Sequence, residues 1–431
     1  MGRVRWASLV RKVHRRAATT VRRKSGLRGQ LELRPDPAEP LVERVSTELG
    51  TGELDRGHQL AELAWQRRPD HLQLQDLLVA SLDRRGDVAR ALALSVDNAR
   101  RRIGWLQRQR GTGRPPRQLG PQQRILFAGF YRSGSSTVLD YLRRVPGAAR
   151  WTTTGEMRLL KAPGGIADLA SRHQQQGGLT ESDLVDFYLH LTGWKLTRHP
   201  PGTFDSRDVV NRHATVLFRN PHAFGYLQTC LESFLELVDL TSAANPTAAE
   251  LVRFFRDAVG RALDVVATDT QADVLLIDQA INAWRLPLSR FLPPSTFVIV
   301  HRDPRDQFVD VRKRQQQPGL ISPTAESFVR EYRLRRTGAD RDLTTITTQY
   351  GHHTYRVGFE DFVLDHERQA RQLTDALALS PPGDGRSHYN PRRARNGIGQ
   401  HARQVDPCEL AILATSLPEY LDHRSTSTIP A

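Results

Sequence analysis

The sequence predicts an α/β protein, in which a parallel β-sheet is flanked by helices in three layers and is preceded by a small helical domain. Residues 125–128 form a short apolar run that passes through a Gly- and Ser-rich turn into helix-like apolar spacing at residues 138–142. Residues 274–277 and 297–300 are two further apolar runs, joined by a helix-like segment, as in a parallel βαβ unit. A repeat with a period of 34 residues near the N-terminus indicates the helical domain.

The composition indicates a cytoplasmic chain of two or three domains. With 431 residues, 39% of them hydrophobic, the chain is long enough to bury real cores. No run approaches the roughly 18 to 20 apolar residues of a membrane span, and the charged N-terminus lacks the apolar core of a secretory signal. Two cysteines, Cys230 and Cys408, cannot provide a disulfide framework or a four-thiolate metal site.

The net charge of +15 is concentrated in a basic tail, residues 1–35, whose first 28 residues carry ten Lys or Arg and no acidic residue. Because the rest of the chain is only mildly basic, specific nucleic-acid binding is not indicated. The tail is either a solvated, disordered segment or a basic amphipathic helix in weak contact with an anionic membrane, which would place the protein at the membrane periphery. The apolar residues at helical spacing are Trp6, Val10, Val13, Ala17 and Val21.

Residues 36–118 are predicted to be a helical region that ends in a linker. Segment 52–60 aligns with segment 86–94 at a spacing of 34 residues, and the pair resembles two tetratricopeptide units. Two units fall short of the three that an independent solenoid usually needs, so we expect the region to lean on the next domain or on a protein partner. A plain helical extension is the alternative.

The Gly- and Ser-rich turn has the form of a phosphate-binding loop. Gly129 and Gly134 have the spacing of a Walker A loop, but Ser135 stands where that loop has its lysine, and the cation lies inside the loop at Arg132. Backbone N–H groups at a helix N-terminus bind anions, and the helix dipole favours negative charge there. The alternative is an ordinary turn with an exposed arginine.

A second candidate anion site, the segment 301–306, follows the strand predicted at 297–300. In parallel sheets ligands bind beyond the carboxyl ends of the strands, and both Arg302 and the first loop have that position. Two anion sites on one sheet edge suit a nucleotide that carries phosphates at its 5′ and 3′ positions.

Together the two motifs are similar to those of the sulfotransferases that use 3′-phosphoadenosine 5′-phosphosulfate (PAPS), and the resemblance covers about residues 120–425, within a domain expected at 119–425. It implies a P-loop-type fold and in-line transfer of a sulfuryl group from PAPS to a hydroxyl or amine. It also implies that Arg132 acts in catalysis and that Arg302 binds the 3′-phosphate. The residues implied at the 5′-phosphate are Arg132, Ser133, Gly134, Ser135, Ser136 and Thr137.

The chain departs from the family pattern around the 3′-phosphate. Asp310 replaces the serine expected eight residues after Arg302, so either its carboxylate points away or the pairing shifts to Arg312. The family's Arg-Lys-Gly loop, which closes over the 3′-phosphate, is resembled by Arg395, Asn396 and Gly397, with Asn396 in place of the lysine.

The resemblance also suggests a general base, because an acceptor hydroxyl has to lose its proton in order to attack sulfur well. The candidate is Glu156, in the Gly-Glu that follows the second strand. Residues 160–270 are expected to form a mostly helical, acceptor-binding insert, and a capping box at Thr247–Glu250 opens one of its helices. The acceptor, a small molecule or a glycan, has no signature in the sequence. The alternative base is a histidine of the insert: His173, His190, His199, His213 or His222.

Two other functions compete with this interpretation. Relatives commonly have Glu-Lys-Thr-Pro where this chain has Asp-Gln-Ala-Ile at 278–281, and the departures at Gln279, Ala280 and Asp310 favour a non-catalytic, sulfotransferase-like binding protein. A P-loop kinase is less favoured, because the loop lacks the lysine. No metal is implied, since no pair of Mg²⁺ ligands accompanies the loop.

Overall fold

The computed structural model describes residues 39–51, 54–110, 123–130, 132–151, 157–194, 223–315, 323–383 and 389–421. The chain divides into two units, residues 1–43 and 44–431, and the architecture below is that of the second. The basic tail predicted at 1–35 lies outside the described residues.

A parallel five-stranded sheet forms the centre of this unit, in the order β2-β3-β1-β4-β5. β1 (Gln123–Gly129) is the middle strand and is buried along most of its length, which explains its unbroken apolar run. The predicted α/β class is confirmed. The strands predicted at 274–277 and 297–300 both pair with β1 from opposite sides, so their crossover spans one strand. The other strands are β2 (Ala148–Arg150), β3 (Val274–Asp278), β4 (Thr296–His301) and β5 (His353–Gly358).

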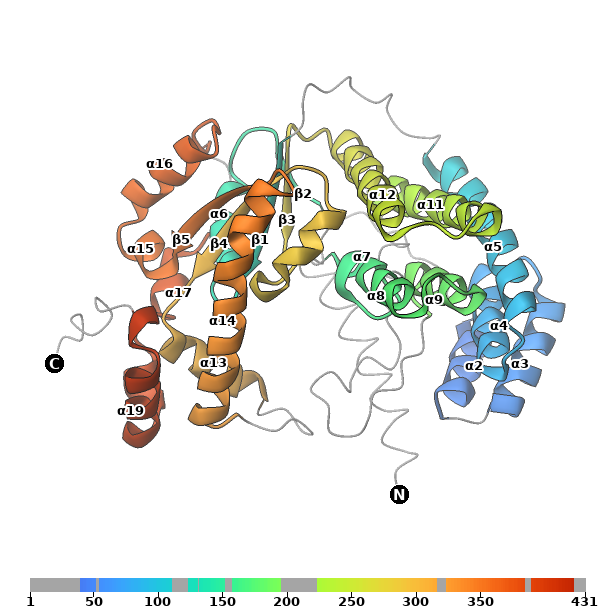
Figure 1. Ribbon diagram of the computed structural model, residues 1–431, viewed down its shortest axis with the longest axis horizontal. Coiled ribbons are helices and arrows are strands. Elements are labelled where there is room, and N and C mark those ends of the chain that lie inside the picture. Colours follow the sequence, from blue (N-terminus) through green and yellow to red (C-terminus); the bar gives the residue numbers. More distant parts are fainter. Residues whose placement is uncertain are drawn as a thin grey trace. The chain divides into compact units, whose positions relative to one another are not determined.

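Helices cover both faces of the sheet, and Figure 1 shows α14 (Ala325–Thr348) across one face and α6 (Ser135–Leu142) behind the strands. Ile125 and Phe127 of β1 pack with Val138 and Leu139 of α6 in one buried cluster. This cluster also takes in residues of α15 (Phe359–Leu364), α16 (His366–Ala376) and α17 (Pro391–Arg395). The C-terminal part adds α13 (Pro304–Gln315), α18 (His401–Gln404), α19 (Pro407–Ser416) and the 3₁₀ turn η3 (Pro418–Tyr420).

The described part of the insert predicted at 160–270 is helical. It contains α8 (Ile166–Gln176), α9 (Glu181–Thr192), α11 (Phe224–Ala243) and α12 (Ala248–Thr270), and α7 (Arg158–Lys161) precedes it. The predicted capping box opens α12: Thr247 Oγ1 accepts from the Glu250 N–H, and Glu250 Oε2 accepts from the Thr247 N–H at 2.8 Å. The helix-like segment between β3 and β4 is η2 (Ala283–Phe291), which consists of two short 3₁₀ stretches that meet at a kink, where Arg285 has non-helical backbone angles (φ −124°, ψ 29°).

The N-terminal helices are α2 (Glu39–Thr51), α3 (Leu54–Arg67), α4 (Leu72–Arg85) and α5 (Val88–Arg110). Of these, α4 packs against α9 of the insert, and α5 packs against α9 and α11. α3 and α5 begin 34 positions apart, which matches the repeat, although their identity as tetratricopeptide units stays a prediction. Trp105 of α5 meets Phe224 of α11 edge to face, with ring centroids 5.4 Å apart. The region therefore leans on the next part of the chain.

Within the described residues, no helix is both long and apolar enough to cross a membrane.

Candidate functional site

The predicted 5′-phosphate loop connects β1 to the N-terminus of α6. Gly134 caps α6 with φ +86°, and a Cβ there would lie 2.2 Å from the Phe359 ring, so only glycine fits. Ser135 is buried in the first turn, and Thr137 donates its N–H to the Gly134 carbonyl at 2.8 Å. The first N–H groups of a helix have no partner within it, so this turn presents donors to an anion.

Two serines of the loop have contrasting surroundings. Ser133 is 1% exposed, and its Oγ has no hydrogen-bond partner within the described residues. A buried hydroxyl of this kind is costly unless a ligand or water satisfies it. Ser136 is exposed and donates from Oγ to Asp278 Oδ2 at 3.4 Å, and Arg150 Nη2 donates to the same oxygen at 3.4 Å. Asp278 thus ties the loop to the carboxyl end of β3.

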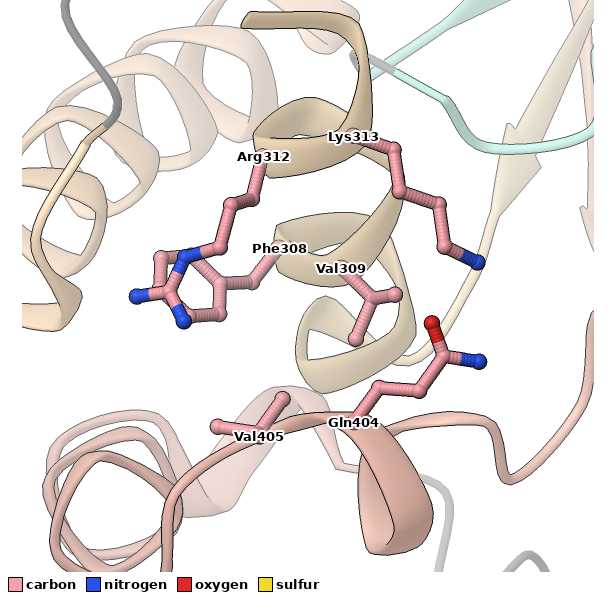
Figure 2. Close-up of a pocket in the computed structure, with 6 residues that line it drawn as sticks. All are labelled: Phe308, Val309, Arg312, Lys313, Gln404 and Val405. Atoms are coloured by element: carbon pink, nitrogen blue, oxygen red, sulfur yellow. The ribbon is translucent and has the colours of Figure 1, made fainter. Parts of the chain in front are cut away.

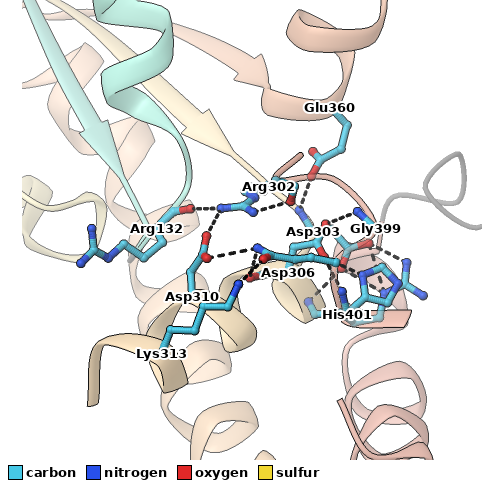
Figure 3. A network of polar contacts seen from close by, with 12 residues as sticks. Arg132, Arg302, Asp303, Asp306, Asp310, Lys313, Glu360, Gly399 and His401 are labelled. Atoms are coloured by element: carbon cyan, nitrogen blue, oxygen red, sulfur yellow. Dashed lines mark hydrogen bonds and ion pairs between the residues drawn. The ribbon is translucent and has the colours of Figure 1, made fainter. Parts of the chain in front are cut away.

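Arg302, at the end of β4, joins three parts of the site (Figure 3). Its Nη1 donates to the Arg132 carbonyl at 2.8 Å and to Asp310 Oδ2 at 2.7 Å, and its Nη2 donates to the Gly397 carbonyl at 2.6 Å. Its guanidinium carbon lies 5.0 Å from the centre of the Phe359 ring. The two predicted phosphate segments, 170 residues apart, therefore lie side by side at one sheet edge.

The expectation that Asp310 points away is wrong, and the alternative, that the phosphate pairing shifts to Arg312, stays a prediction. Asp310 faces Arg302, whereas Arg312 bonds to Glu409 of α19, with Nη1 2.9 Å from Oε2. The reason is helix geometry: two residues along α13 rotate the side chain by about 200°, so Arg312 lies on the opposite face from Asp310.

The C-terminal loop is held by buried carboxylates as well as by Arg302. Asp306 is fully buried and accepts from the Gly399 N–H at 2.8 Å, from the His401 N–H at 3.0 Å and from His401 Nδ1 at 2.8 Å. Of the three predicted loop residues, Gly397 meets Arg302 through its carbonyl. Arg395 and Asn396 are exposed at the end of α17.

Two titratable groups beside Arg302 are shifted by burial. Burial raises the pKa of Glu360 to about 8, and Glu360 accepts from the Asp303 N–H at 3.0 Å. Burial, reinforced by the charge of Arg336, lowers the pKa of His301 to about 3. Arg336 donates to His301 Nδ1, so the His301 ring is neutral at physiological pH. The uncharged forms of both groups predominate at that pH, so neither changes the charge balance between Arg302 and Asp310.

A cavity lies next to this network, between α13 and the segment after α18 (Figure 2). Its volume of about 60 Å³ suits a few waters and is too small for a nucleotide. Lys313 at its margin donates to Gln400 Oε1 at 2.7 Å. The cavity is lined by Phe308, Val309, Arg312, Lys313, Gln404 and Val405.

The sequence prediction missed Lys161. This lysine of α7 donates from Nζ to the Gln279 carbonyl at 3.0 Å, and Arg285 Nη1 donates to the Lys161 carbonyl at 3.2 Å. Gln279 follows β3 with φ +46°, next to the Asp278 that holds the loop. An ammonium group therefore lies near the position where the family pattern has its lysine. No local signal reveals this, because 118 residues separate Lys161 from Gln279.

The candidate bases are only partly within the described residues. Glu156 lies outside them, as do His199, His213 and His222. His190 is buried near the end of α9. His173 is also buried, and its Nε2 lies 2.6 Å from the Pro246 carbonyl, which is a contact typical of a structural histidine. The assignment of Glu156 as the base stays a prediction.

Comparison with known proteins identifies a protein family whose sequence model matches this chain. A family model described as "Sulfotransferase family" matches residues 73–382. No curated protein shows significant similarity to the chain. Among solved structures, a sulfotransferase from Mycobacterium tuberculosis shares 13% identity at a TM-score of 0.36, over 89% of this chain and 99% of that one. A sulfotransferase from Mycobacterium avium shares 14% identity at a TM-score of 0.34, over 86% and 96%. The sulfotransferase domain of the curacin biosynthetic pathway shares 11% at 0.34, over 71% and 100%.

Proposed function

The chain belongs to the sulfotransferase family, and we propose that it transfers a sulfuryl group from PAPS to a hydroxyl or amine of a small-molecule or glycan acceptor. The observation that supports PAPS as the donor is the hydrogen bond of 2.8 Å from Arg302 Nη1 to the Arg132 carbonyl. It joins the 5′-phosphate loop to the segment proposed for the 3′-phosphate. A ligand with phosphates on both sides of one ribose matches two such adjacent sites.

The residues at the 5′ end fit an anion well. The loop offers the N–H groups of the α6 N-terminus, the exposed Ser136 hydroxyl and the Ser133 hydroxyl, which has no partner among the described residues. The 3′ end fits less simply, because Arg302 is already paired with Asp310. Its Nε–H, however, is buried without an acceptor in the described part of the chain, and we assign this unsatisfied donor to the ligand.

In-line transfer makes positioning and charge neutralisation the main catalytic demands, by analogy with phosphoryl transfer. In this proposal the Arg132 guanidinium and the loop N–H groups stabilise charge that develops on the bridging oxygen and the sulfuryl group. Lys161 supplies a second cation at the carboxyl end of β3. Glu156 takes the proton of the acceptor.

The surroundings of the site complete the proposal. The helical insert would bind the acceptor, and the exposed surface of the N-terminal helices is a candidate contact for a protein partner. A cytoplasmic location, with weak contact between the basic tail and anionic membranes, is consistent with the sequence. These assignments rest on composition and on the resemblance.

Incubation with ³⁵S-labelled PAPS and a panel of hydroxyl and amine acceptors tests the reaction. We expect labelled product, and loss of at least about 100-fold in kcat/KM for Arg132→Ala. Arg341→Ala, which removes an exposed arginine of α14, is the matched control and should leave the rate unchanged. Tight PAPS binding with no turnover on any acceptor would favour the non-catalytic alternative, and phosphoryl transfer from ATP would favour a kinase.

A further inference from the structure

We propose that Asp310 is a specificity-determining residue at the 3′ position of the nucleotide. By pairing with Arg302 it reduces the gain in affinity that a 3′-phosphate brings, relative to a free 3′-hydroxyl. This inference rests on the proposed function, because it assumes that the nucleotide binds with its ribose beside Arg302.

Asp310 is fixed in place by contacts on both carboxylate oxygens. Its Oδ2 accepts from Arg302 Nη1 at 2.7 Å, and its Oδ1 accepts from Gln400 Nε2 at 3.1 Å. Gln400 is itself held through Oε1 by Lys313 Nζ at 2.7 Å. The ion pair is thus part of a connected set of hydrogen bonds that links α13 to the C-terminal loop (Figure 3). The Arg302–Asp310 pair is therefore linked to other side chains and is not an isolated ion pair on the surface.

The burial of the Arg302 side chain makes the charge balance of this pair matter. The Arg302 side chain is 4% exposed, and that of Asp310 is 30% exposed. The other acceptors of Arg302 are the Arg132 and Gly397 carbonyls, which carry no net charge. The positive charge of Arg302 is therefore largely balanced before any nucleotide binds. A phosphate beside Arg302 therefore meets a guanidinium already matched by a carboxylate.

The two possible 3′ groups respond differently to this arrangement. A phosphate brought beside Arg302 is repelled by Asp310, since like charges at contact distance repel strongly where solvent is partly excluded. A hydroxyl has no such cost and can donate a hydrogen bond to the carboxylate. Dinucleotide-binding folds use the same logic, with an acidic residue for a ribose hydroxyl and an arginine for a phosphate. Here both residues stand in one site.

Calorimetric titration with adenosine 3′,5′-bisphosphate and adenosine 5′-monophosphate tests the proposal. We expect the wild-type protein to prefer the bisphosphate by less than about tenfold. Asp310→Ser and Asp310→Asn should each tighten bisphosphate binding by about 10- to 100-fold and leave the monophosphate within about threefold. The second variant keeps the shape and the hydrogen-bond acceptor, so agreement between the two assigns the effect to charge.

Glu409→Gln is the matched control. It removes one carboxylate from the ion pair with Arg312, on the other face of α13, and should leave the bisphosphate preference unchanged. Weaker or unchanged bisphosphate binding in both folded Asp310 variants would overturn the inference and make Asp310 a positioning residue for Arg302. An equal gain in the control would overturn it too, because net charge would then explain the effect. If no folded variant binds either nucleotide, the donor proposal itself falls.

Discussion

Replacing Gly134 by alanine should damage both the fold and the nucleotide site. At φ +86° an alanine costs about 1–2 kcal/mol. Its Cβ would also lie 2.2 Å from Cδ2 of Phe359, a buried ring against which Arg302 stacks. Overpacking of this kind costs about a further 1–3 kcal/mol, because the ring cannot move without displacing the guanidinium. The free energy of unfolding should therefore fall by about 2–5 kcal/mol.

Gly86 provides a control with the same backbone angle and no collision. It caps α4 at φ +83°, and a Cβ there would have no atom within 4 Å. Gly86→Ala should therefore cost only the about 1–2 kcal/mol of the left-handed conformation. The loss of unfolded-state entropy on changing Gly to Ala is the same in both variants and cancels in the comparison. The difference, about 1–3 kcal/mol, isolates the contact with Phe359.

Two measurements together decide the matter. Urea unfolding gives the free energy of unfolding of each variant, and calorimetric titration gives its affinity for adenosine 3′,5′-bisphosphate. We expect Gly134→Ala to weaken binding at least about tenfold, since a displaced loop loses hydrogen bonds to a charged group, each worth about 1.5–3 kcal/mol. Gly86→Ala should bind as the wild type does. Equal destabilisation by the two variants, with binding intact in both, would refute the role given to this loop.

Three further predictions concern single side chains. Burial raises the pKa of Glu360 from 4.5 to about 8, so its contribution to stability is complete below pH 4.5 and is lost as pH rises through 8. Urea unfolding across this pH range should show a falling free energy of unfolding, and Glu360→Gln should flatten this pH dependence. Lys161→Met should lower kcat at least about tenfold with little change in donor affinity, and Lys161→Arg should keep part of the wild-type kcat. If Lys161→Met lowers only the urea midpoint of unfolding and leaves kcat unchanged, Lys161 has a structural role only. Tyr188→Phe removes the donor that reaches buried Asp76 at 2.6 Å and should lower the free energy of unfolding by about 1.5–3 kcal/mol in urea. Asp97→Ala, which breaks an exposed ion pair, should cost less than about 1 kcal/mol, and equal costs in the two variants would contradict the importance of burial.

The parts of the fold that could be predicted are those with local signals. Apolar runs marked β1, β3 and β4, and the capping box at Thr247 marked the start of α12. The strand order could not be predicted in the same way, because the placement of β1 between β3 and β4 depends on pairing between distant residues. The helix-like pattern at 285–292 falls in a kinked 3₁₀ segment, which apolar spacing alone does not distinguish from an α-helix.

The candidate site shows the same division between local and distant information. The loop glycine and the arginine after β4 were visible as motifs, whereas the partners of Arg302 lie 170, 8 and 95 residues away. The sequence also indicates that Asp310 is unfavourable beside a phosphate, and this stays a prediction. What the sequence could not show is that α13 turns the Asp310 carboxylate toward the buried Arg302 guanidinium, so that the two form an ion pair.

The N-terminal helices are joined to the insert by more than apolar contact. Asp76 of α4 is completely buried, where it pairs with Arg102 of α5 and accepts from the Tyr188 hydroxyl of α9 at 2.6 Å. Each buried charge costs several kcal/mol in lost hydration, so the pair is tolerable only while α4, α5 and α9 stay closed around it. The family match, residues 73–382, likewise includes most of α4 and all of α5. A boundary at residue 119 stays a prediction about the chain's organisation, but a fragment that began there would expose Tyr188 and Phe224, which now pack against α4 and α5. The helical insert therefore depends on helices that precede the β1–α6 loop in sequence.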